Sequence, residues 1–113
     1  MMVKLLARVQ ADVESELQEA RKNNGHYFHS NHEGFAVLAE EAQEADDEAK
    51  SVGGSVKVLF HWLRMDNPER MKHVLTNIRY KAIQAAAEFI QVAAMAEKMI
   101  ESMEEGSDER END

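Results

Sequence analysis

The sequence has no cysteine among its 113 residues, one proline, five glycines and few aromatic residues. Without cysteine there is no disulfide framework and no thiolate metal site, which suits a cytoplasmic protein. No apolar run approaches the roughly 18 residues that a membrane-spanning helix needs. The first eight residues are too short and too interrupted for a signal peptide. We therefore expect a cytoplasmic protein of one domain that does not enter a membrane.

Basic residues are scarce as well. The chain has 13 lysines and arginines against 22 acids, so its formal net charge is −9. A protein that binds polymeric nucleic acid would show a basic patch, so the acidity argues against that class. A chain this short buries a limited share of its surface on folding, and a helical chain would gain from pairing with a second copy. We expect a homodimer or a homotetramer.

The acids are distributed unevenly. Residues 104–113 hold six acids, one arginine and no apolar residue. Such a segment cannot bury anything, so we expect a disordered acidic tail at 104–113 after a domain over 1–103. Within that domain, residues 33–48 hold seven acids and no base.

Alanine, glutamate, methionine and leucine dominate the composition and predict an all-α fold. Gly25 has the place of a helix C-cap, the Ser-x-x-Glu sequence at 30–33 has the form of a capping box, and Pro68 marks a helix start. Gly53 and Gly54 predict a break. We expect helices over 3–22, 31–50, 55–65 and 68–103, with a kink or break near 76–77, forming a bundle of four to five helices.

On a helix over 31–50, residues follow one another at 100° intervals. Glu41, Glu44 and Glu48 then lie together along one flank of the apolar stripe. Three carboxylates at the edge of a core repel one another and resist desolvation, and a bound divalent cation would relieve them. The alternative is an ordinary solvated helix face. The expected buried stripe consists of Phe35, Leu38, Ala42, Ala45 and Ala49, and three of the remaining acids, Glu33, Glu40 and Asp47, face solvent.

From residue 78 to 103 the last predicted helix is apolar around most of its circumference, which predicts a central, buried helix. Lys81, Gln84, Glu88 and Gln91 interrupt it along one side. These polar residues would be explained if a cation joined them to the flank of Glu41, Glu44 and Glu48 on the other helix. Mg2+ is the natural ion, because it prefers oxygen ligands in octahedral geometry, and Mn2+ is an alternative.

Two motifs resemble a known family. Glu40-Glu41-Ala42-Gln43-Glu44 and Glu88-Phe89-Ile90-Gln91 resemble the paired motif of the all-α nucleoside triphosphate pyrophosphohydrolases, and in particular of small MazG-like proteins. The family pattern is Glu-x-x-Glu on one helix and Glu-x-x-Asp on another. The first half matches, whereas Gln91 replaces the usual Asp. The resemblance covers residues 29–50 and 80–100.

The resemblance implies a MazG-like bundle completed by homo-oligomerisation. It implies hydrolysis of a nucleoside triphosphate between the α and β phosphates, giving a monophosphate and pyrophosphate. By motif position, Glu41 and Glu44 are catalytic, and the Mg2+ ligands are Glu41, Glu44, Glu88 and Gln91, with Glu48 as a further candidate. Lys81 and His32 are candidate substrate-binding residues.

Gln91 removes one negative charge from the family pattern. It is therefore compatible with an alternative of another class, a non-catalytic helical binding or assembly protein that retains the fold.

Overall fold

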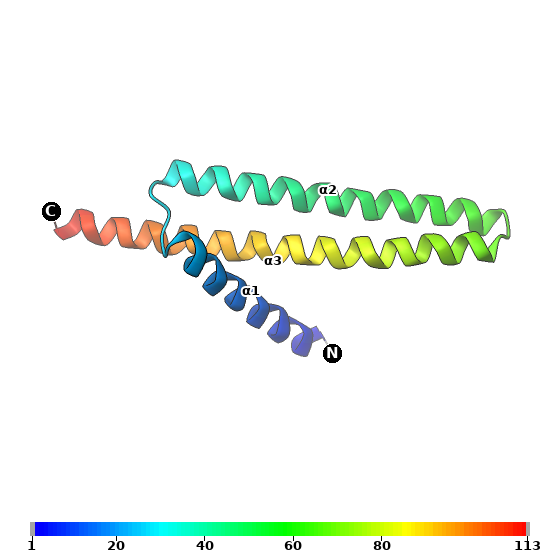
Figure 1. Ribbon diagram of the computed structural model, residues 1–113, viewed down its shortest axis with the longest axis horizontal. Helices are drawn as coiled ribbons and strands as arrows, with labels where there is room; N and C mark the ends of the chain where they lie inside the picture. Colours follow the sequence, from blue (N-terminus) through cyan, green and yellow to red (C-terminus); the bar gives the residue numbers. More distant parts are fainter. Residues whose placement is uncertain (1, 113) are drawn as a thin grey trace.

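The computed structural model describes the backbone of residues 2–112 and the side chains of residues 2–106. It consists of α1 (Met2–Asn24), α2 (Asn31–Arg64) and α3 (Pro68–Asn112). The two long helices α2 and α3 form an antiparallel hairpin, and α1 packs against α3 near one end and then diverges from it (Figure 1). The described chain is all-α, as predicted. It measures 70 × 29 × 22 Å, and none of its helices has an apolar stretch long enough to cross a bilayer.

The predicted start and stop signals are confirmed. Gly25 has a φ of +88°, and its N–H donates to the carbonyl of Arg21 at 2.9 Å, which ends α1. Ser30 Oγ accepts a hydrogen bond from the N–H of Glu33 at 3.1 Å and caps α2. Asn67 Oδ1 accepts a hydrogen bond from the N–H of Arg70 at 3.0 Å and caps α3. Local sequence therefore sets the end of α1 and the starts of α2 and α3.

The predicted break at Gly53 and Gly54 is wrong, because α2 continues through both glycines to Arg64. The predicted break near 76–77 is also absent, since α3 is continuous there. A glycine inside a helix costs roughly 1 kcal/mol relative to alanine, which weakens a helix without ending it. Neither Gly53 nor Gly54 adopts a positive φ. Val52 and Ser55 on either side are covered by α3, and this packing keeps the helix continuous. The single chain therefore has three helices in its described part, not four to five.

The contact between α2 and α3, called the seam below, has a heptad pattern. Buried or half-buried residues recur along both helices at alternate intervals of four and three residues, the spacing of paired helices in coiled coils. Polar side chains interrupt this seam. It consists of Gly34, Leu38, Glu41, Ala45, Glu48, Val52, Ser55, Leu59 and Trp62 on α2, and of Met71, Val74, Ile78, Lys81, Ala85, Glu88, Val92, Met95, Met99 and Ser102 on α3.

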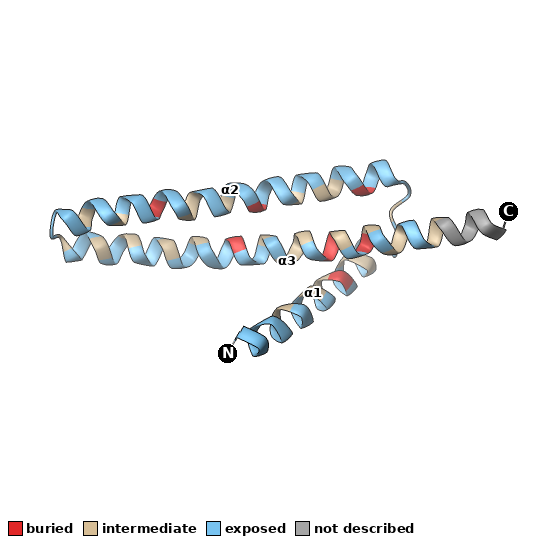
Figure 2. Cartoon of the chain, turned by 180° about the vertical axis from the view of Figure 1, so that it is seen from behind, coloured by how far each residue is buried: buried red, intermediate tan, exposed pale blue. Residues whose placement is uncertain are grey.

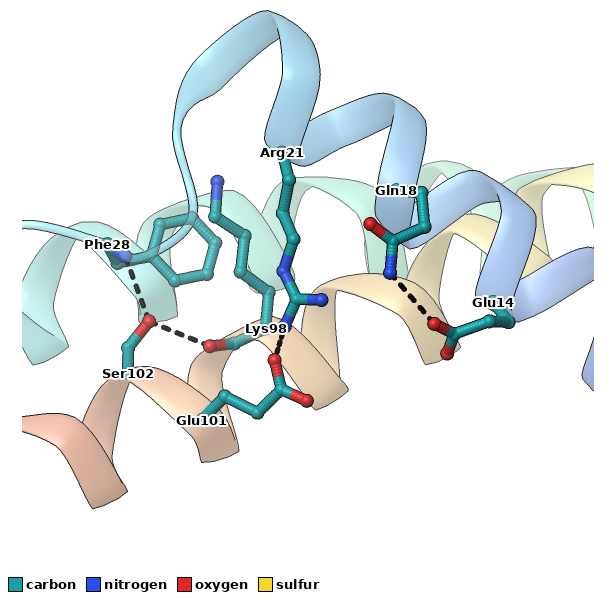
Figure 3. A network of polar contacts seen from close by, with 7 residues as sticks. All are labelled: Glu14, Gln18, Arg21, Phe28, Lys98, Glu101 and Ser102. Carbon is teal, nitrogen blue, oxygen red and sulfur yellow. Dashed lines mark hydrogen bonds and ion pairs between the residues drawn. The ribbon is translucent and has the colours of Figure 1, made fainter.

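The small apolar core lies where α1 meets the hairpin, which we call the α1 end. Leu17 of α1 is 1% exposed and packs with Ala94 and Met95 of α3. Polar contacts secure the same region (Figure 3): Arg21 forms an ion pair with Glu101, Phe28 N–H donates to Ser102 Oγ at 2.9 Å, and the Lys98 ammonium lies 4.5 Å from the centre of the Phe28 ring. These contacts fix α1 and the α1–α2 connection to the carboxyl half of α3.

Large parts of the hairpin are uncovered. Among the described residues, five hydrophobic side chains are buried, and exposed positions follow both long helices (Figure 2). The predicted buried stripe is therefore partly wrong: Leu38 and Ala45 are covered, whereas Phe35, Ala42 and Ala49 are exposed. The prediction of a buried α3 fails in the same way, because a seam with one helix covers one stripe only. Ile83, Phe89 and Ile100 are each at least half exposed.

The predicted acidic tail begins within α3, whose bounds reach Asn112. The side chains from residue 107 onward, and residue 113 altogether, lie outside the described residues. The disorder expected for 104–113 stays a prediction.

Replacing Gly54 with alanine should stabilise α2. A Cβ at this position meets no atom within 4 Å, and Ala loses less backbone entropy than Gly in a helix. We expect Gly54→Ala to raise the free energy of unfolding by about 0.5–1 kcal/mol in denaturant titrations followed by circular dichroism. Gly25→Ala is the control: its Cβ also meets nothing, but its φ of +88° should lower stability by about 1 kcal/mol or more. A loss of stability in Gly54→Ala would contradict this account of α2.

Candidate metal centre

Three of the predicted ligands come together. One carboxylate oxygen from each of Glu41, Glu44 and Glu88 can be chosen so that the three lie within 4.8 Å of one another. Glu41 and Glu88 are half-buried seam residues on opposite helices, and Glu44 is exposed on the flank that α1 approaches. In the described part of the chain, no other group of three or more His, Asp or Glu side chains meets this geometry. The antiparallel seam therefore brings the two motif halves together across more than forty residues of sequence.

The charges in this group oppose one another. Burial raises the pKa of Glu41 above its ordinary value, and the neighbouring Glu44 and Glu88 carboxylates raise it further. The pKa of Glu44 is also raised, by partial desolvation and then by the charges of Glu88 and Glu40. No lysine or arginine contributes to either shift. The group therefore carries excess negative charge at neutral pH, the electrostatic condition that favours a bound cation.

Gln91, the predicted fourth ligand, is engaged elsewhere. Its amide nitrogen donates a hydrogen bond to Glu16 Oε1 of α1 at 2.8 Å. The charge of Glu16 is one of the causes that raise the pKa of Glu41, so α1 brings a fourth carboxylate to the edge of the group. An aspartate at position 91 would set a second negative charge toward Glu16. The amide thus suits its neighbour on α1, which gives the departure from the family pattern a local structural reason.

Other candidate residues lie farther along the hairpin. Glu48 is a half-buried seam residue one turn beyond Glu44 and is outside the group. Lys81 also lies in the seam, where its ammonium donates to Ser55 Oγ at 3.0 Å. It is seven residues from Glu88, or about 10 Å along α3. His32 is exposed in the first turn of α2, nine residues and about 13 Å from Glu41. The structure does not bring these three side chains to the carboxylate group.

Glu16 is the residue near the group that sequence reasoning missed. It precedes Leu17, the fully buried side chain of α1. Because it is next to this buried residue, Glu16 lies at the edge of the contact between α1 and α3 and is half-buried. The sequence of α1 does not show which part of the hairpin Leu17 packs against. Its proximity to Glu41 therefore became visible only with the tertiary structure.

Two surface hollows lie away from this group, near the turn between α2 and α3. One contains Arg70, Lys72 and His73 in its lining, and the other contains Arg79 and Tyr80. The carboxylate group lines neither. Since both hollows follow the surface of α3 and are open to solvent, they add no ligands to the candidate centre.

The three carboxylates fit a hard divalent cation. Mg2+ binds oxygen at about 2.0–2.1 Å, so oxygens in its shell lie at most about 4.2 Å apart. The observed spacing within 4.8 Å is slightly wider, and rotation of exposed Glu44 can narrow it. Three protein oxygens leave octahedral positions for water or substrate phosphate oxygens. Glu41, Glu44 and Glu88 are therefore the residues of this chain that would hold such an ion.

Comparisons of this chain with protein-family models, curated proteins and solved structures find no match.

Removing one charge from the group should stabilise the chain when no divalent cation is present. The folded pKa of Glu41 is raised, so its charge destabilises the fold above that pKa, and this penalty disappears as the pH falls toward the ordinary value of 4.5. Glu41→Gln should therefore melt at a higher temperature than the wild type at pH 7 with EDTA, and the difference should shrink toward pH 4.5. Glu97→Gln, an exposed change on α3, is the control and should show no such trend. A lower melting temperature for Glu41→Gln at pH 7 would contradict the repulsion.

The Gln91–Glu16 contact can be tested by exchange. Gln91→Glu replaces the donor with a second carboxylate and should lower the free energy of unfolding by about 1–2 kcal/mol. In the double variant Gln91→Glu with Glu16→Gln, the amide at position 16 can donate a hydrogen bond to the carboxylate at position 91. It should recover most of the loss in denaturant titrations. Additive losses in the double variant would show that the two side chains do not interact.

Proposed function

We propose that the protein is a Mg2+-dependent nucleoside triphosphate pyrophosphohydrolase, which converts an NTP or dNTP to the monophosphate and pyrophosphate. The observation that carries this proposal is the convergence of Glu41, Glu44 and Glu88 from two helices with no base among them. These are three of the four positions at which the sequence resembles the MazG-like motif. Mn2+ is the alternative ion.

The charge balance supports a metal-chelated nucleotide over a free one. A triphosphate would be repelled by the carboxylate group and by the net charge of −9. When bound, the divalent ion offsets phosphate charge and stabilises the charge that develops on the oxygens during cleavage. The protein residues hold the ion, and a carboxylate of Glu41 or Glu44 that is not fully engaged accepts a proton from the attacking water.

Two further side chains complete the proposal. The Lys81 ammonium lies in the seam toward the turn, and release from Ser55 would let it approach a substrate phosphate. His32, exposed at the start of α2, is assigned a contact to the nucleoside. We infer that the active form is a homo-oligomer, a homodimer or a homotetramer, since most of the hairpin is uncovered in one chain.

Pyrophosphate release from a panel of NTPs and dNTPs, with Mg2+ or Mn2+, tests this activity and identifies the substrate. We expect turnover of at least one nucleotide by the wild type. Glu41→Gln and Glu44→Gln should each lower the rate by on the order of a hundredfold, since even residues that only orient metal ligands have effects of 10–100-fold. Glu97→Gln is the matched control and should retain the wild-type rate, because Glu97 is exposed outside the group.

Binding can be separated from turnover by calorimetry. Mg2+ with a non-hydrolysable nucleotide should give heat with the wild type and little with Glu44→Ala. Equal, negligible heats would contradict the metal centre. Heat without turnover of any nucleotide at high protein concentration would instead favour the non-catalytic binding protein.

A further inference from the structure

One stripe along the hairpin has no charged residue at any of its ten positions within the described side chains. On each long helix, five apolar residues lie seven positions apart. Each of them directly follows a seam residue. Nine of these ten residues are exposed and Ala96 is half-buried. This uncovered face consists of Phe35, Ala42, Ala49, Val56 and Leu63 on α2, and of Leu75, Ala82, Phe89, Ala96 and Met103 on α3.

The uncovered face lies opposite α1. In an antiparallel pair of helices, residues that follow equivalent seam positions lie on the same side of both helices. Residues that contact α1, such as Gln91 and Val37, lie on the other flank of the seam. The ten side chains therefore share one side of the hairpin, and α1 does not cover that side in the described part of the chain. Phe35 is 65% exposed there and Phe89 is 50% exposed.

This surface is large enough for a stable interface. Next to it around the helices lie five further apolar residues, and the charged Asp46, Lys72 and Arg79 occupy other positions of the same flank. With the five apolar residues the face comprises fifteen residues, which approaches the roughly 20–30 per partner of a standard interface. The five apolar residues are Ala39, Phe60, Ala86, Ala93 and Ile100.

The distribution of charge along the hairpin favours a second copy of the chain as the partner and favours an antiparallel orientation of the two hairpins. Residues 51–83, at the end with the α2–α3 turn, hold six lysines and arginines against two acids. The α1 end is acidic: residues 31–50 hold seven acids and one lysine, and residues 84–106 hold five acids and one lysine. The hairpin therefore has one positive and one negative end. A second copy in reversed direction is complementary to it, whereas a parallel copy would set like charges side by side.

We propose that the uncovered face packs against the same face of a second copy with the two hairpins antiparallel, forming a four-helix bundle. The basic turn end of each protomer then lies beside the acidic α1 end of the other. A two-fold axis in the interface sets α2 against α2 and α3 against α3. It passes near Ala49, the middle residue of the face on α2. This arrangement does not depend on the proposed catalytic activity.

Sedimentation equilibrium of the full chain tests the interface. We expect a particle of twice the 12.8 kDa chain mass. Ala49→Glu buries a charge at the interface and should weaken the dimer by about tenfold or more. Ala36→Glu makes the same change at an exposed position of α2 outside the face and should leave the mass unchanged. A monomeric wild type, or equal effects of the two variants on association, would overturn the proposal.

The direction of the hairpins is tested by cross-linking, because the chain has no native cysteine. In the antiparallel dimer, Ala49→Cys should form a disulfide with its own copy, and Phe35→Cys should pair with Leu63→Cys when the two variants are mixed. In a parallel dimer, Val56→Cys would pair with Leu75→Cys instead, and that result would overturn the proposed orientation. Neither measurement uses enzymatic activity, so a failed activity assay leaves both results interpretable.

Discussion

Glu41 and Glu88 meet in the seam between α2 and α3, where heptad packing ordinarily places apolar side chains. Ala45 and Ala85 lie within one turn of them along the seam and are nearly fully covered. Small side chains let the two helices approach closely, and this proximity prevents the glutamates from spreading apart. The seam thus holds like charges together, at a cost that burial and mutual repulsion impose on Glu41 in particular. A bound cation, as we propose, would offset this repulsion at the point where it arises.

Helix α1 adds a further negative charge near this group and also packs firmly against the hairpin beside it. Glu16 approaches from α1, and Gln91 binds it through an amide that brings no charge of its own. Leu17, the next residue, is the best-buried side chain of α1. The Arg21–Glu101 ion pair then fixes the following turn of α1 to α3. Apolar burial and an ion pair therefore hold a carboxylate near three others, where electrostatics alone would separate them. Gln91 is explained by this contact, whether or not its carbonyl oxygen also binds an ion.

Local sequence determined much of what could be predicted. The caps at Gly25 and Ser30 and the helix start at Pro68 are short-range features, and each was found where the sequence indicated. The approach of Glu41 and Glu44 to Glu88 followed from two polar stripes on two helices. The continuity of α2 through Gly53 and Gly54 could not be predicted locally, because packing of Val52 and Ser55 against α3 outweighs the propensity of glycine. The position of Glu16 and the exposure of Phe35 depend on which face of the hairpin α1 covers, and the sequence of α1 does not specify that face.

The two sides of the hairpin differ in composition. The side toward α1 is polar near the carboxylate group and leaves Glu44 accessible to solvent. The opposite side has no charged residue at the ten repeating positions of the uncovered face, although this chain is 31% charged overall. Repulsion across the seam tends to separate α2 and α3, whereas a second hairpin on the uncovered face would contact both helices at once. Packing on that side would hold the seam closed without covering the carboxylates. The proposed dimer would thus leave the carboxylate group accessible, because the second copy and the carboxylates lie on opposite sides of the same pair of helices.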